Sequence, residues 1–166
     1  MEPTTSSTID RDFASQAASE ALTALTTATA NVVHAKRLID VHSRVSKELH
    51  LKSGNLEVKT KGTLRELNKY ITPSLQCRLA EGKSQFTKAS KAYTEATGKS
   101  TDESIMTRPE PRRAPTRAES DALLLEVQMA QERYLNDHVE VSDTYLEKCY
   151  GEYEKVLCTD MFEPKA

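Results

Sequence analysis

Residues 21–49, ALTALTTATANVVHAKRLIDVHSRVSKEL, decide the fold that the sequence predicts. Apolar side chains recur there seven residues apart, in the row Leu25, Val32 and Ile39. A second row on the same face consists mostly of alanine and comprises Ala21, Ala28, Ala35, His42 and Leu49. Two such rows are typical of a helix that pairs with another helix along a seam. Because alanine is small, the second row predicts a close approach of the paired helices.

The same periodicity extends outward and predicts a first helix over about residues 8–51, behind a polar tail of residues 1–7. We expect Gly54 to end this helix, because glycine readily adopts the left-handed conformation found after many helices. A second helix over about residues 56–97 then completes a helical hairpin of residues 8–98.

Pro73 interrupts the pattern of the second helix. It has no N–H to donate to the carbonyl of Lys69, so we expect a kink or break near Pro73, with Thr72 as the cap if a new helix begins. Beyond it, apolar residues alternate at spacings of four and three until Gly98 ends the segment.

Residues 99–115 have no helical period and contain three prolines, which predicts a linker. Thr116 and Glu119 then form the pattern of a capping box, which predicts the start of an acidic amphipathic C-terminal helix over residues 116–162. The apolar seam of this helix includes Leu135, Val139, Leu146 and Tyr153. An upstream apolar row is offset from that seam, which predicts a stutter near residue 132.

These patterns together predict an all-α protein, an elongated antiparallel helical bundle or coiled coil of about three long helices. The composition agrees with this fold class. Of the 166 residues, 29% are charged and 5% are aromatic, so long amphipathic helices fit the chain better than a thick globular core.

Charge is distributed unevenly along the chain. Residues 51–117 contain fourteen Lys or Arg against seven Asp or Glu, a net charge of +7, whereas residues 118–166 contain four against twelve, a net charge of −8. Two interpretations stay open. The basic and acidic segments face each other within one bundle, or they face different partners whose binding is steered by complementary charge.

Motifs of catalysis and of cofactor binding are missing from the sequence. His34, His42 and His50 are spaced by eight residues, so on a helix they point in different directions and cannot share one metal ion. The tripeptide GKS at residues 98–100 matches the end of a phosphate-binding loop, but Tyr93 stands where that loop needs glycine. We therefore expect no enzymatic activity, no metal, no cofactor and no small-molecule substrate.

The predicted location of the protein is intracellular and cytoplasmic, with the nucleus as an alternative. Cys77, Cys149 and Cys158 lie far apart in the sequence, which is typical of reduced thiols. The first thirty residues lack the apolar core of a signal peptide, and no apolar run approaches the roughly 18 residues of a membrane-spanning helix.

We expect a structural or scaffold subunit of a multiprotein assembly that acts by coiled-coil pairing with helices of other proteins. Hetero-oligomers are favoured over homo-oligomers, because the stutter, Pro73 and the small residues make the seams irregular. The seam residues expected at the partner surface are Leu25, Val32, Ile39, Leu135, Val139, Leu146 and Tyr153.

The linker offers a second candidate surface. The stretch RPEPRRAPTRAES, residues 108–120, places arginines among prolines, and Arg112, Arg113 and Arg117 are candidates for contact with a partner. The simpler interpretation is a solvated linker that keeps two helices from fusing. An alternative function of the basic segment is binding to an anionic membrane surface, a nucleic acid or a cytoskeletal filament.

Overall fold

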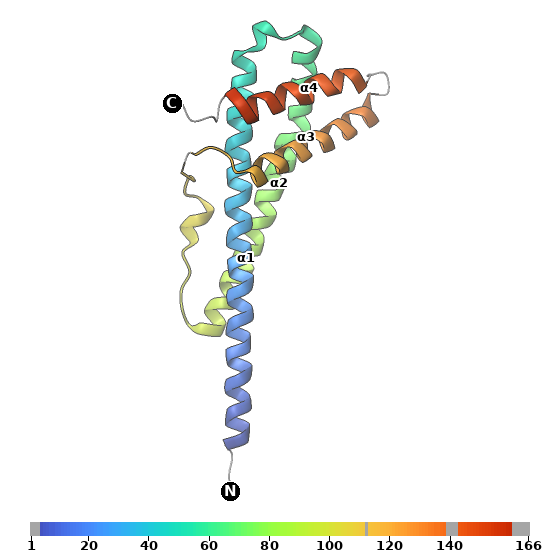
Figure 1. Ribbon diagram of the computed structural model, residues 1–166. Helices are drawn as coiled ribbons and strands as arrows, with labels where there is room; N and C mark the ends of the chain where they lie inside the picture. The colour runs from blue at the N-terminus through green and yellow to red at the C-terminus, as the bar shows by residue number, and fades with distance from the viewer. Residues whose placement is uncertain (1–3, 112, 139–142, 161–166) are drawn as a thin grey trace. The chain divides into compact units, whose positions relative to one another are not determined.

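The structure is a computed structural model that describes residues 4–111, 113–138 and 143–160 (Figure 1). The four α-helices are α1 (Thr4–Leu51), α2 (Val58–Thr97), α3 (Arg117–Asp137) and α4 (Asp143–Lys155), and a π-helical turn (Val156–Asp160) continues α4. No strand occurs among these residues, and the helices pack against one another, so the all-α prediction is confirmed.

The chain forms two compact units, and both α1 and α2 contribute to each of them. Unit 1 consists of Met1–His34 and Leu79–Pro109, and unit 2 consists of Ala35–Arg78 and Glu110–Ala166. The predicted division into hairpin, linker and C-terminal helix therefore does not coincide with the compact units of the structure.

Unit 1 is built on an antiparallel pair formed by parts of α1 and α2. Its buried core consists of Ala28, Val32, Phe86, Ala89 and Ile105. Ile105 comes from a 3-10 helix (Glu103–Met106) in the segment after α2. The helices approach closely at Gly82, where a Cβ atom would lie 3.4 Å from Cγ2 of Val32.

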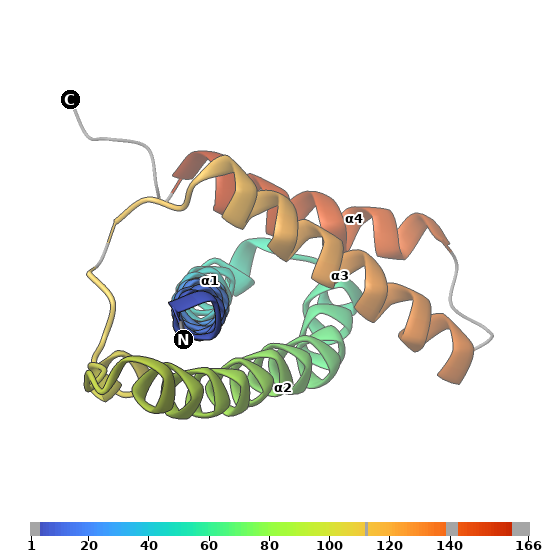
Figure 2. The same ribbon diagram turned by 90° about the horizontal axis from the view of Figure 1, so that it is seen from below.

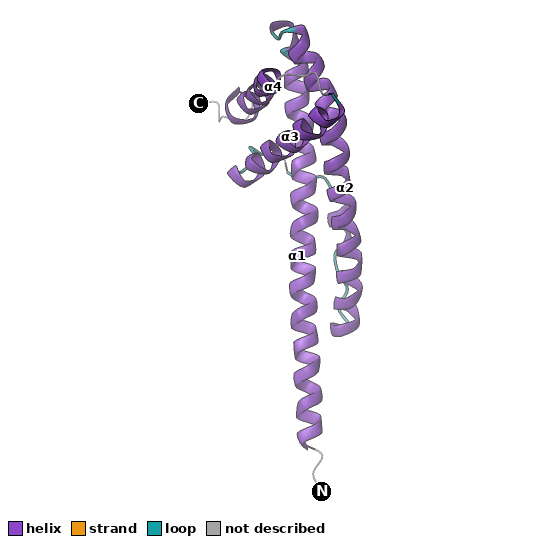
Figure 3. Cartoon of the chain, turned by 90° about the vertical axis from the view of Figure 1, so that its right-hand side faces the viewer, coloured by secondary structure: helices purple, strands orange, loops and turns teal. Residues whose placement is uncertain are grey.

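The first turns of α1 extend past the end of α2 in unit 1 (Figures 1 and 3). From Phe13 to Glu20 every side chain is exposed except that of Ala18, which is half-buried. We call residues 4–20 the α1 overhang. Burial of the α1 seam begins at Ala21, and thus well after the start of the helix.

Unit 2 surrounds one stretch of α1 with the other three helices. Its buried apolar core comprises Leu38, Val41, Val45 and Leu49 of α1, Leu67, Ile71 and Leu75 of α2, Leu123, Val127, Ala130 and Tyr134 of α3, and Leu146, Cys149, Tyr153, Val156 and Leu157 of the C-terminal segment. The helices α3 and α4 lie side by side and antiparallel (Figure 2).

Two predicted helix ends differ in the structure. Pro73 lies inside α2, which continues from Val58 to Thr97, so no new helix begins at Thr72. Burial of Ile71 and Leu75 on either side of the exposed proline holds the helix in place. Gly54 does not have the predicted left-handed conformation, because it lies in a 3-10 helix (Ser53–Asn55). Gly98 ends α2 with a φ of 72°.

The segment predicted as one helix over residues 116–162 is two helices. The predicted capping box is confirmed at Thr116, which starts α3, but α3 ends at Asp137. The C-cap residue His138 donates its N–H to the carbonyl of Tyr134 at 2.8 Å, and the two rings stack at 4.3 Å. The offset between the two apolar rows near residue 132 thus reflects two helices that face one core. No helix in the described segments combines the length and apolar character that a membrane span needs.

Candidate functional site

The seam residues predicted on α1 pack inside the chain. Val32 is fully buried in the core of unit 1, and Leu25 is half-buried against that core. Ile39 is half-buried against the core of unit 2. Each of these side chains therefore has neighbours within its own unit.

The seam residues predicted on the C-terminal helix also face the core of unit 2. Leu146 and Tyr153 are buried in it, and Leu135 is half-buried against it. Val139 lies outside the described residues. Contact of these seam residues with another protein stays a prediction, since the surfaces that the structure describes here are covered by the chain itself.

The candidate arginines of the linker have different surroundings. The half-exposed Arg113 places Nη1 at 3.1 Å from Oε1 of Glu119. The side chain of Arg117 is 95% exposed and lies 4.0 Å from Asp121. Arg112 lies outside the described residues. Arg117 is thus the more exposed of the two described arginines.

A buried arginine on α1 holds the linker in place. Arg37 is 2% exposed, and its Nε donates to Oε2 of Glu119 at 2.9 Å. Its other nitrogens donate to the main-chain carbonyls of Pro111, Arg113 and Ala114 at 3.2–3.4 Å. A buried guanidinium needs such partners, because an unpaired charge in the interior is costly. We call this group the Arg37 cluster.

Two further contacts hold the same stretch of linker on α1. Lys36 forms an ion pair with Glu110 at 3.0 Å, and both side chains are largely buried. Arg44 donates to the carbonyl of Arg113 at 3.4 Å. Glu110, Pro111, Arg113 and Ala114 are therefore docked on α1 within unit 2, which neither interpretation of the linker included.

Glu119 serves the Arg37 cluster and the capping box at once. Burial alone would raise the pKa of its carboxyl group, but hydrogen bonds from Thr116 and Arg37 outweigh this effect and lower the pKa below its usual value. Its main-chain N–H donates to the Thr116 hydroxyl at 3.2 Å, and its carboxylate accepts from the N–H of Thr116 at 3.2 Å. The start of α3 is thereby fixed to α1.

Ion pairs join the basic and the acidic segments within unit 2. Arg113 pairs with Glu119, and Arg78 pairs with the buried Glu126 at 2.5 Å. Glu126 also accepts from the hydroxyl of Ser74 at 2.8 Å. Part of the opposite charge in the two segments is therefore matched inside the chain.

A second buried polar group is the pair of His42 and Tyr153. Nδ1 of His42 lies 2.8 Å from the Tyr153 hydroxyl, and Nε2 of His42 has no hydrogen-bond partner. Burial lowers the pKa of His42 to about 4, although the nearby Asn68 side chain acts in the opposite direction. His42, which stands in the second seam row of α1, is thus a neutral core histidine. Within the described ranges, no group of His, Cys, Asp and Glu is arranged to hold a metal ion.

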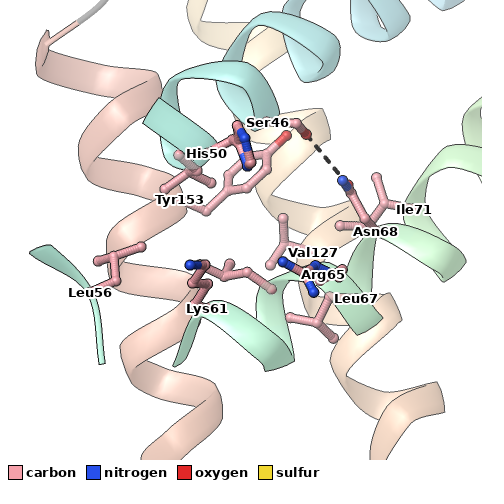
Figure 4. Close-up of a pocket in the computed structure, with 12 residues that line it drawn as sticks. Ser46, His50, Leu56, Lys61, Arg65, Leu67, Asn68, Ile71, Val127 and Tyr153 are labelled. Atoms are coloured by element: carbon pink, nitrogen blue, oxygen red, sulfur yellow. Dashed lines mark hydrogen bonds between the residues drawn. The ribbon is translucent and has the colours of Figure 1, made fainter. Parts of the chain in front are cut away.

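Two adjoining pockets lie next to this pair in unit 2. The first, which we call the hairpin pocket, has a volume of about 130 Å³ and lies at the end of the α1–α2 hairpin (Figure 4). The second has a volume of about 140 Å³ and is bordered by His42. Both share Ser46 and Asn68, and the Ser46 hydroxyl donates to Oδ1 of Asn68 at 3.4 Å.

The sequence gives little sign of the hairpin pocket or of the Arg37 cluster. Lys61 and Arg65, which line the pocket, are one helical turn apart, and that spacing is visible in the sequence. Its apolar wall, however, combines α1, α2 and α3 with the segment between α1 and α2, which only the fold brings together. Arg37 is similarly surrounded in sequence by ordinary helix-surface charges.

No known protein family, curated protein sequence or solved structure matches this chain.

Proposed function

We propose that the protein is a cytoplasmic, non-enzymatic subunit of a multiprotein assembly, and that the α1 overhang of unit 1 binds a helix of another protein. The observation that supports this proposal most is that the helical seam of α1 starts before the part of α1 that the chain itself covers. Helices in proteins owe most of their stability to tertiary packing, so a partner helix that packs on the overhang would stabilise it.

The chemistry of the overhang suits a helix as its occupant. Ala14, Ala17 and Ala18 continue the small-residue seam upstream, and such residues allow close approach of a second helix. Two large apolar side chains flank the seam on either side, Phe13 at 67% exposure and Leu22 at 51% exposure. An uncovered apolar surface of this kind is typical of a binding site.

An open groove of about 340 Å³ continues this surface within unit 1. Leu22 and Leu25 of α1 line it together with Phe86 and Tyr93 of α2 and with Ile105. A partner helix that packs on the overhang can insert a side chain here, as apolar anchors do when a helix binds in a groove.

Charge favours a different protein over a second copy of the chain. The overhang carries Asp10, Asp12 and Glu20 against a single Arg11. Two copies that paired through this segment would bring like charges together, which disfavours homodimers in coiled coils. A helix with a neutral or basic flank is the expected partner.

The double substitution Phe13→Glu and Leu22→Glu tests the proposal. It should abolish capture of the partner helix by the purified chain while the circular dichroism of the chain stays helical. The matched control, Gln16→Glu with Thr23→Glu, adds the same charge at exposed positions away from the seam and should leave capture intact. Loss of capture in both variants, or in neither, would contradict the assignment of the overhang.

Hydrogen exchange on the free chain supplies the second test. We expect amides of the overhang to exchange much faster than those of residues 28–45, and light scattering to give the mass of a monomer. A stable dimer with a protected overhang would replace the hetero-oligomer with self-pairing. Binding to anionic membranes or nucleic acids has less support, because Arg78 and Arg113 of the basic segment are paired with glutamates.

A further inference from the structure

We propose that the hairpin pocket of unit 2 binds a small anionic amphiphile, a carboxylate with an unbranched apolar body of about six carbon atoms. The carboxylate is held at the mouth by Lys61 and Arg65, and the apolar body lies against the leucine-rich wall. This binding site is separate from the helix pairing proposed for unit 1, because no residue that lines the pocket belongs to unit 1.

The wall of the pocket selects an apolar body. Its apolar side chains are Leu49, Leu56, Leu64, Leu67, Ile71 and Val127. Four of them, Leu49, Leu67, Ile71 and Val127, belong to the buried core of unit 2. Ligand sites between helices typically combine such an apolar lining with a few polar groups that orient the ligand.

The size of the pocket limits the length of that body. An apolar cavity of about 150 Å³ in another protein takes up benzene, so the hairpin pocket, at about 130 Å³, has room for roughly five or six carbon atoms. A longer chain has to leave part of its carbon atoms in water.

The mouth of the pocket selects a negative charge. His50, Lys61 and Arg65 line the pocket, and no residue that lines it is acidic. The side chains of Lys61 and Arg65 form no ion pair in the described parts of the chain, so both cations are available to an anion. Figure 4 shows both side chains coming from the same helix, α2, next to the apolar wall.

Two polar side chains that line the pocket, Tyr153 and Ser46, are already engaged. The hydroxyl of Tyr153 is hydrogen-bonded to His42. Figure 4 shows the hydrogen bond between Ser46 and Asn68. The interior therefore has little to offer a second polar group of a ligand, and a single headgroup at the mouth with a plain hydrocarbon body matches the pocket.

The first experiment titrates the full-length chain with straight-chain carboxylates from butanoate to octanoate, followed by NMR shifts of the pocket methyl groups. Affinity should rise about fourfold for each added methylene up to hexanoate and then level off, because further carbons remain in water. A lack of chain-length dependence, or an absence of binding at millimolar hexanoate, would overturn the proposal.

Charge selection is tested in two ways. The first compares hexanoate with hexylammonium, which has the same apolar body, and the second removes the charges of Lys61 and Arg65 at the mouth of the pocket. Hexanoate should bind more tightly than hexylammonium, and Lys61→Gln and Arg65→Gln should each weaken hexanoate binding by up to about fivefold. Lys47→Gln, an exposed position outside the pocket lining, serves as the control and should change nothing. Equal binding of the two ligands would contradict the role of the two cations.

Two further experiments complete the test: a substitution that fills the pocket, and a binding assay with lipid vesicles. Leu64→Trp should abolish hexanoate binding, and if that variant fails to fold, the two mouth variants still decide the question. Co-sedimentation with vesicles that contain phosphatidylserine shows whether the pocket binds a free carboxylate or the headgroup of a membrane lipid. Hexanoate binding without vesicle co-sedimentation supports the proposal, whereas co-sedimentation that depends on Lys61 and Arg65 without hexanoate binding refutes it.

Discussion

In unit 2, α1 packs among three other helices, whereas in the described part of unit 1 its helical neighbours are α2 and one short 3-10 helix. The side chains of α1 change accordingly along the helix. In unit 1 the buried α1 positions are Ala21, Ala28 and Val32, and in unit 2 they include Leu38, Val41 and Val45. Larger aliphatic side chains thus lie where more neighbours are present to surround them.

The two units also differ in what they bury besides apolar groups. Arg37, His42, Glu119 and Glu126 are buried in unit 2, while Ser90 is the polar residue buried in unit 1, among those that the structure describes. Buried charges and rings require specific partners, so the geometry of unit 2 is tightly determined. Unit 1 depends on close contact of small residues and leaves residues 13–20 of α1 largely exposed.

The largest effect is expected from breaking the Arg37 cluster. Arg37→Ala removes the buried cationic partner of the Glu119 carboxylate, and removal of one member of a buried ion pair costs about 3–5 kcal/mol. Urea unfolding followed by circular dichroism measures the loss in the free energy of unfolding.

A matched double variant removes both charges of the Arg37–Glu119 pair. Arg37→Met combined with Glu119→Gln removes both charges and keeps a residue that suits the capping box. It should recover part of the loss, since replacement of a whole buried pair is far less costly than removal of one partner. A loss below about 1 kcal/mol for Arg37→Ala would show that the polar core of unit 2 contributes little stability.

The second largest effect is a dependence of the stability of unit 2 on pH. The pKa of His42 is lowered to about 4 in the folded chain, against about 6.5 in the unfolded chain. Its neutral form therefore contributes stability that is fully present above pH 6.5 and is lost as the pH falls toward 4. The loss amounts to about 3 kcal/mol over this window.

The measurement compares the slope of unfolding free energy against pH for three proteins. His42→Gln should flatten the slope between pH 6.5 and 4 relative to the unmodified chain, even if this variant is less stable at pH 7. The exposed His50 supplies the control, and His50→Gln should keep the original slope. Identical slopes in all three proteins would mean that His42 is not buried in its neutral form.

The smallest effect probes the close helix contact of unit 1. Gly82→Ala places a methyl group at ordinary contact distance from Val32, 3.4 Å, and removes the cost of a glycine inside a helix. We expect a gain of about 0.5–1 kcal/mol in the free energy of unfolding.

A larger side chain at position 82 separates the effect of helix packing on stability from the effect of helix propensity. Gly82→Leu should lower stability by about 1–3 kcal/mol, because the added carbons meet the backbone of Val32. Gly62, also in α2 but in unit 2, has no neighbour within 4 Å of its virtual Cβ atom. Tolerance of leucine at both positions would contradict the close approach at Gly82.

The elements that sequence alone predicts well are those that local chemistry determines. Residues of the predicted seam rows are buried at Ala28, Val32, Ala35 and Leu49, and Thr116 forms its capping box with Glu119. Gly98 ends α2 with a positive φ, as a glycine after a helix commonly does. Each of these features depends on residues only a few positions apart.

The remaining features depend on contacts between distant segments. A kink or break is expected near Pro73, and burial of Ile71 and Leu75 keeps α2 continuous across it. No glycine or proline near Asp137 predicts that α3 ends there. His42 stands in a seam row, but its partner Tyr153 comes from far along the chain, as does Glu119, the partner of Arg37.

The hydrogen bonds from Arg37 to the linker affect which substitutions the linker can accept. Arg37 contacts main-chain oxygens of Pro111, Arg113 and Ala114, which every amino acid possesses. Pro115 restricts Ala114 to an extended backbone, and thereby helps to present those oxygens without regard to the neighbouring side chains. The exposed side chains at Pro111 and Ala114 are thus free to diversify between species while the path of the backbone stays the same.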